Sequence, residues 1–131
     1  CSGIRDSMVW PSGKGVKVQW TAMGEGCVDM GTLFKEWGER CPETPVQIET
    51  ISGFAREFPY LEKDFWPPYS TIRADDYSRF LALARKGKTL SPFSAPDDAD
   101  KKKAQQDYQL SELEKSFSYC RKKLGMGRKK A

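Results

Sequence analysis

The chain of 131 residues contains no histidine, the side chain that serves most often as a general base and as a metal ligand. Its four cysteines include no Cys-x-x-Cys pair, on which structural zinc sites usually depend. No apolar run approaches the roughly 20 residues that a membrane-spanning helix needs. These absences exclude histidine-based catalysis and argue against a zinc site.

Glycine-rich phosphate-binding motifs are also missing. The stretch PSGKG at 11–15 lacks the G-x-x-x-x-G-K-[ST] spacing of a phosphate loop, and no helix follows GMG at 125–127. The chain has 18 acidic residues, but no pair stands out by spacing as a catalytic carboxylate couple. We therefore expect a protein that is not an enzyme and that has no cofactor and no metal.

The composition indicates a foldable chain with few aliphatic residues. Hydrophobic residues make up 38% and aromatic residues 12%, and the mean hydropathy is −0.68. The aromatic share exceeds that of disordered chains, and the length suits one domain. We expect a single small domain over residues 1–131, with an extended N-terminal arm (1–14), that completes its core against a partner.

Periodicity predicts an α+β fold dominated by helices. Apolar residues at three- and four-residue steps predict helices at 29–40, 74–87 and 96–124. Alternation predicts short strands at 15–20 and 44–52, with Gln19 on the solvent side of the first. Long segments rich in proline and aromatic residues should be irregular. The last helix carries a narrow apolar seam that we expect to pack against helix 74–87: Leu110, Leu113, Phe117, Cys120 and Leu124.

The segment 54–69 concentrates six aromatic residues around three prolines, so it cannot form one helix. We expect a polyproline II stretch near Pro67 and Pro68. Aromatic residues beside prolines cover apolar area at low entropic cost, and Trp and Tyr are enriched at interface hot spots. The segment is therefore the predicted partner-docking surface, through Phe58, Tyr60, Phe65, Trp66, Pro67, Pro68 and Tyr69.

The net charge of +4 is concentrated at the C-terminus. Residues 120–131 carry +6, which leaves −2 for residues 1–119. This basic tail consists of Arg121, Lys122, Lys123, Arg128, Lys129 and Lys130. It suits a membrane surface or an acidic protein face, or it only solubilises the helix end and complements the helix dipole. Nucleic-acid binding is not favoured, because Tyr119 is the only aromatic residue near these charges that is free to stack on a base.

The cysteines leave two questions open. Cys27, Cys41 and Cys120 are candidates for a disulfide or for buried thiols, and Cys27 and Cys41 flank a predicted helix that separates them if it is straight. Cys1, followed by Ser2 and Gly3, is a candidate acylation or processing site, although Ile4, Met8, Val9 and Trp10 follow too early for a free tether.

Three functional hypotheses follow. The first is a non-catalytic accessory subunit of a large membrane-associated complex in an organelle, photosynthetic or respiratory, peripheral to a chloroplast or mitochondrial membrane and bound to other protein subunits. The second is a bacterial envelope lipoprotein acylated at Cys1, or another periplasmic or outer-membrane interaction protein. The third is a ribonucleoprotein subunit that contacts RNA through the basic tail.

Overall fold

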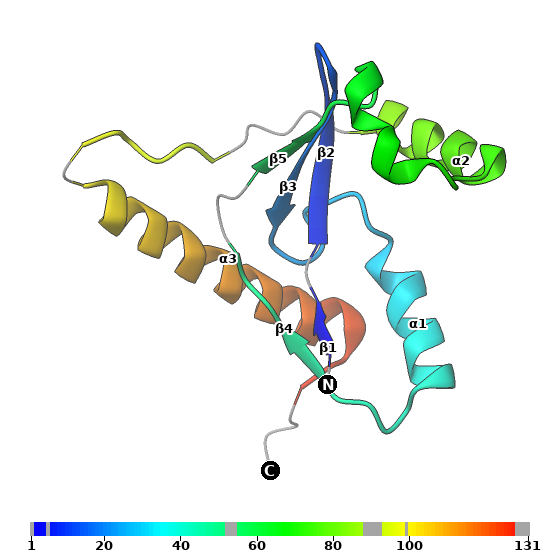
Figure 1. The fold of residues 1–131 in the computed structure, drawn as a ribbon. Helices are drawn as coiled ribbons and strands as arrows, with labels where there is room; N and C mark the ends of the chain where they lie inside the picture. Colours follow the sequence, from blue (N-terminus) through cyan, green and yellow to red (C-terminus); the bar gives the residue numbers. More distant parts are fainter. Residues whose placement is uncertain (1, 5, 52–54, 88–92, 99, 128–131) are drawn as a thin grey trace.

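The computed structural model describes residues 2–4, 6–51, 55–87, 93–98 and 100–127. Three helices surround a small three-stranded antiparallel sheet, so the helix-dominated α+β prediction is confirmed. Figure 1 shows the sheet in the centre, α2 on one side, and the long α3 crossing below it. Among the described residues, no helix is both long enough and apolar enough to cross a membrane.

The antiparallel sheet has the order β2–β3–β5, with β2 at Asp6–Ser12, β3 at Gly15–Thr21 and β5 at Ala55–Phe58. Glycine at 13 and 15 closes a tight hairpin, so β2 and β3 pair over their whole length. Gln19 is only 1% exposed, which corrects its prediction as a solvent-facing residue. Both sheet faces hold buried side chains, Met8 and Gln19 on one and Val16 on the other, so simple alternation misplaces Gln19.

A second sheet pairs β1 (Ser2–Ile4) with β4 (Val46–Ile48) in parallel, with Ser2 opposite Val46 and Ile4 opposite Ile48. Residues 2–4 and 6–12, within the predicted extended arm, are thus strands of two sheets. The predicted strand at 44–52 is shortened to three residues. Figure 1 shows this pair at the lower end of the molecule, away from the tip of the β2–β3 hairpin.

Helices α1 (Met30–Arg40) and α2 (Ala74–Arg85) lie close to their predicted bounds. Asp29 caps α1, because its carboxylate accepts the backbone N–H and the hydroxyl of Thr32. These bonds hold the pKa of Asp29 below its ordinary value. Local signals of this kind explain why both helices could be located from the sequence.

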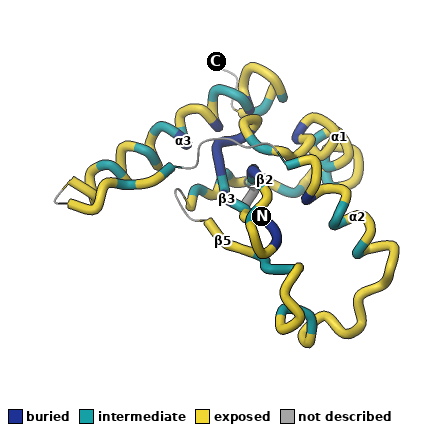
Figure 2. The backbone as a smooth tube through the Cα atoms, turned by 90° about the horizontal axis from the view of Figure 1, so that it is seen from above, coloured by how far each residue is buried: buried dark blue, intermediate teal, exposed yellow. Residues whose placement is uncertain are grey.

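Helix α3 (Lys101–Leu124) begins five residues later than predicted. Asp98 accepts the N–H of Asp100 through its side chain and that of Lys101 through its carbonyl, so a turn replaces the first helical turn. Figure 2 shows the N-terminal part of α3 extending away from the rest, mostly exposed. The helix ends at Gly125, whose φ of 64° suits a left-handed cap.

The prediction that the apolar seam of α3 packs against α2 is wrong. The buried side of α3 is formed by Glu112, Ser116 and Cys120, while Leu110 and Phe117 are 56% and 45% exposed. The helix contacts α1 and the loop after β3, whereas α2 packs on β2. Small and polar side chains lie on the buried side because the loop backbone approaches α3 closely there.

One carboxylate fixes that loop. Asp6 is fully buried and accepts four backbone N–H groups, from Ser7 and Val28 at Oδ1 and from Gly24 and Gly26 at Oδ2, at 2.7–3.2 Å. A Cβ on Gly26 would lie 2.1 Å from Asp6 Oδ1, so only glycine fits there. Asp6 therefore ties the start of β2 to the loop that leads into α1.

Candidate docking site

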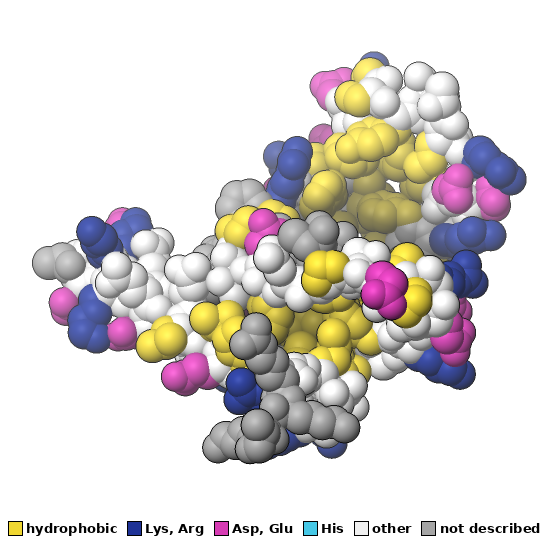
Figure 3. Space-filling model, turned by 90° about the horizontal axis from the view of Figure 1, so that it is seen from below, with side chains coloured by type: hydrophobic (Ala, Val, Ile, Leu, Met, Phe, Trp, Pro, Cys, Tyr) yellow, Lys and Arg dark blue, Asp and Glu magenta, His cyan; other side chains and the backbone are white. Residues whose placement is uncertain are grey.

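A hydrophobic groove of about 610 Å³ opens where β4, α1 and the C-terminal end of α3 meet. Its residues come from four separate parts of the chain: Met23, Phe34, Val46, Gln47, Ile48, Phe117, Cys120, Arg121, Met126 and Gly127. Figure 3, which views the molecule from below, shows hydrophobic side chains gathered in hollows on this face. We call this feature the apolar groove.

The floor of the apolar groove is the small core of the domain. Met23, Met30 and Cys120 are buried together, and Phe34, Ile48 and Met126 pack against them while still partly exposed. Phe34 follows Met30 by one helical turn, so α1 presents both side chains on one face. Gly125 redirects the chain after α3 and brings Met126 back to this cluster.

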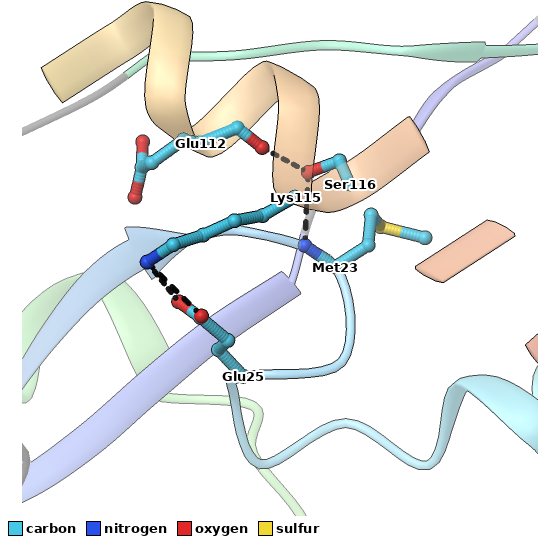
Figure 4. Close-up of polar contacts among 5 residues, drawn as sticks. All are labelled: Met23, Glu25, Glu112, Lys115 and Ser116. Carbon is cyan, nitrogen blue, oxygen red and sulfur yellow. Dashed lines mark hydrogen bonds and ion pairs between the residues drawn. The ribbon is translucent and has the colours of Figure 1, made fainter. Parts of the chain in front are cut away.

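Polar contacts hold the α3 wall of the groove in place, as Figure 4 shows. The backbone N–H of Met23 donates to the Ser116 hydroxyl at 3.0 Å, and that hydroxyl donates to the Glu112 carbonyl at 2.7 Å. Lys115 forms an ion pair with Glu25 at 3.1 Å on the surface beside them. The Met23–Ser116 contact is buried and joins residues 93 positions apart, so it fixes the loop against the helix.

Positive charge borders the apolar groove. The last turn of α3 carries Arg121, Lys122 and Lys123, all exposed, and Arg121 lines the groove itself. None of the ion pairs between described residues involves Arg121. The other members of the predicted basic tail, Arg128, Lys129 and Lys130, lie outside the described residues. The groove thus combines an apolar floor with a cationic rim.

The predicted docking segment lies elsewhere and is partly packed on itself. Trp66 donates from Nε1 to the Tyr60 carbonyl at 2.9 Å and meets Tyr77 of α2 edge-on, with ring centroids 5.1 Å apart. Phe65 stacks on Tyr69 at 5.0 Å. Phe58, Tyr60, Phe65 and Trp66 are half-buried, while Pro67, Pro68 and Tyr69 are exposed.

The backbone of this segment also differs from prediction. Lys63–Phe65 and Pro67–Tyr69 form 3₁₀ helices, labelled η1 and η2, in place of the expected polyproline II stretch. Phe58 belongs to strand β5. The rings of Phe65, Trp66 and Tyr69 cluster because the two turns place them close together. The remaining exposed area of the predicted surface is therefore its 3₁₀ turn at 67–69.

The three described cysteines are free thiols, so the candidate disulfide among them is not formed in this structure. Cys27 is exposed before α1, Cys41 is half-buried just after it, and Cys120 is buried in α3. The 11 residues of α1 extend about 16 Å, which exceeds the roughly 7 Å that a disulfide spans. Burial raises the pKa of Cys120. Cys1, the candidate acylation or processing site, lies outside the described residues.

The groove lies apart from the one described tyrosine, Tyr108, whose pKa is strongly raised. No group of three or more metal-ligating side chains occurs in the part of the chain that the structure describes. Burial raises the pKa of Tyr108 strongly, and the Glu112 carboxylate that accepts its hydroxyl adds to the effect. Tyr108 is stacked against Phe93, with ring centroids 3.9 Å apart, and does not line the groove. The lining of the groove is mainly apolar, with Gln47 and Arg121 as its polar side chains.

The apolar groove was not predicted from the sequence, because its lining residues come from four separate parts of the chain. The nearest signal in the sequence was the alternation of Val46 and Ile48, together with the spacing of the aromatic residues Phe34 and Trp37.

No family model, no curated protein and no solved structure matches this chain. The function of the chain is therefore inferred from the geometry of the groove.

Proposed function

We propose that this protein is a non-catalytic accessory subunit that acts by docking to another protein through the apolar groove. The observation that supports this most strongly is the balance between buried and exposed hydrophobic residues. Among the described residues, seven hydrophobic side chains are buried, whereas nine large ones are exposed, including Phe117 at the groove. A domain of this size with so thin a core gains stability by covering such surface with a partner.

The surface area supports the same conclusion. The accessible area is 9750 Å², whereas a compact monomer of 14.9 kDa exposes about 7,000 Å². The N-terminal part of α3, which extends away from the rest of the molecule and is mostly exposed, contributes to this difference. The cationic rim at Arg121, Lys122 and Lys123 favours a partner with an acidic edge.

The setting of the assembly stays a prediction from the sequence. We retain an organellar, membrane-peripheral complex as the proposed context. The lipoprotein alternative depends on Cys1 and the RNA-binding alternative on the whole basic tail, which lies only partly within the described residues. The aromatic segment around Tyr69 stays a second predicted docking surface.

The test compares two exposed hydrophobic residues on different faces. Phe117→Asp places a charge in the apolar groove, whereas Leu83→Asp changes a residue of α2 that is 69% exposed and outside the groove. In extracts of the source cells, size-exclusion chromatography should show the wild-type chain and Leu83→Asp at a mass well above 14.9 kDa. Phe117→Asp should elute as the free subunit while keeping its circular dichroism spectrum. Wild-type protein eluting alone, or equal behaviour of the two variants, would contradict the proposal.

A further inference from the structure

The parallel pair β1–β4 forms a small sheet of its own. The sheet consists of these two strands, and within the described parts of the chain no further strand pairs with the outer side of either. Parallel strands normally lie inside larger sheets that are covered on both faces, and a two-stranded sheet is marginal in water. Here the pair is three residues long on each side, which is shorter than a usual strand.

Strand β4 is also part of the apolar groove. Val46, Gln47 and Ile48 all line the groove, and Ile48 packs against the buried cluster of Met23, Met30 and Cys120. A peptide that lies along β4 therefore contacts two kinds of surface at once. Its backbone meets the free N–H and C=O groups of an edge strand, and its side chains meet an apolar hollow.

Charge adds a third requirement. Arg121 lines the groove next to Lys122, and no ion pair between described residues neutralises it. An occupant with a carboxylate at that point would complement the rim. Backbone pairing, alternate apolar side chains and one acidic residue together describe an extended peptide segment.

From these observations, and given the docking function proposed above, we infer that the partner supplies a β-strand that adds to the free edge of β4. Its alternate apolar side chains enter the apolar groove, and a carboxylate faces Arg121. The partner strand extends the β1–β4 pair to three strands, which is the smallest sheet that is commonly stable when one face is covered. Main-chain hydrogen bonds supply affinity, and the groove selects the side chains.

The probe is a synthetic peptide of about six residues, the usual length of a strand, with blocked ends. Valine and threonine alternate in it around one central glutamate. A strand bonds to one neighbour through every second residue, so two control peptides carry N-methyl groups on alternate amides in opposite phases. Fluorescence anisotropy of a labelled peptide against the whole chain should show saturable binding. One methylated phase should weaken binding at least about tenfold, while the other phase should leave it nearly unchanged.

The proposed ion pair with Arg121 is tested separately. Arg121→Glu should weaken binding of the glutamate peptide about threefold, the range of an exposed ion pair, and replacing the peptide's glutamate by lysine should restore it. Lys102→Glu, at the exposed far end of α3, should leave binding unchanged. Equal binding of both methylated peptides, or no saturable binding of the parent peptide, would overturn strand addition.

The two proposals fail separately. If Phe117→Asp disrupts the native assembly while both methylated peptides bind alike, docking through the groove stands and strand addition is wrong. If one methylated phase abolishes binding while Phe117→Asp leaves the native assembly intact, the edge of β4 accepts strands but the groove is not the docking site of the cell.

Discussion

The two sheets of this protein differ in how far they are completed by their own chain. In the antiparallel sheet, β2 and β3 pair along seven residues each, and Met8, Val16 and Gln19 are almost fully buried. In the parallel pair, β1 and β4 are three residues long and Gln47 is exposed. The antiparallel sheet is closed by a local hairpin, whereas the parallel pair is bordered by a groove. Self-contained packing and the proposed partner binding are thus divided between the two sheets.

The junction between the sheets should be the most sensitive point. Asp6 begins β2 directly after β1, and its carboxylate satisfies four backbone N–H groups in a fully buried position. Asp6→Ala would leave these donors without their acceptor, so we expect the free energy of unfolding to fall by at least about 3 kcal/mol. Urea unfolding followed by circular dichroism measures this, with exposed Asp64→Ala as the control. Equal midpoints for the two variants would show that the loop is held by other contacts.

Removing the buried contact of α3 should cost less. Ser116→Ala leaves the Met23 N–H without its acceptor, and we expect a loss of about 1–3 kcal/mol. Ser118→Ala on the same helix, where the side chain is half-buried, is the matched control and should change stability by less than about 0.5 kcal/mol. The parallel pair should respond more than the antiparallel sheet, because α3 forms the wall beside β4. Amide exchange that rises equally in β3 and β4 would contradict this division.

A matched pair of strand variants compares the sheets directly. Val18 in β3 and Ile48 in β4 are both half-buried. We expect Val18→Ala to lower global stability by about 1 kcal/mol, since it removes packing from the central strand. Ile48→Ala should mainly accelerate exchange of the β4 amides, because that strand opens locally. Hydrogen exchange by mass spectrometry separates the loss of global stability from the local opening of β4. If Ile48→Ala lowered global stability as much as Val18→Ala, the two sheets would not differ in the way proposed.

The smallest expected effect is a change in how the stability of the fold depends on alkaline pH. Burial raises the pKa of Cys120 above its ordinary value of 9.0, so the folded state holds the thiol proton more tightly than the unfolded state. This contribution to stability is fully present below pH 9.0 and is lost as pH rises through the folded pKa. Cys120→Ala should flatten the decline of stability above pH 9.0, and Cys27→Ala should not. Parallel pH profiles for the two variants would contradict this origin.

The sequence was sufficient where the deciding interactions are local. All three helices were located from the local spacing of apolar residues, and their ends are set within a few residues by the Asp29 cap of α1, the acidic first turn of α2 and the stop at Gly125. The start of α3 was misplaced because Asp98 can bond the backbone in a turn as well as in a helix.

Elements that depend on distant neighbours were not predictable. Gln19 occupies an outward position in a half-buried strand, but here both faces of the sheet are covered. Phe117 fits an apolar seam, yet the neighbouring loop packs against Ser116 instead. The apolar groove combines β4 with two helices, and no single segment carries its pattern.

The Met23–Ser116 contact also determines at which stage of folding the groove forms. The β2–β3 hairpin closes within microseconds because its strands are adjacent, but joining Met23 to Ser116 requires closure of a 93-residue loop. During synthesis the hairpin and α1 emerge before α3. Phe117, Cys120 and Arg121 belong to α3, so the groove acquires its second wall only after α3 docks. A partner that recognises the groove therefore selects chains whose synthesis has passed the end of α3.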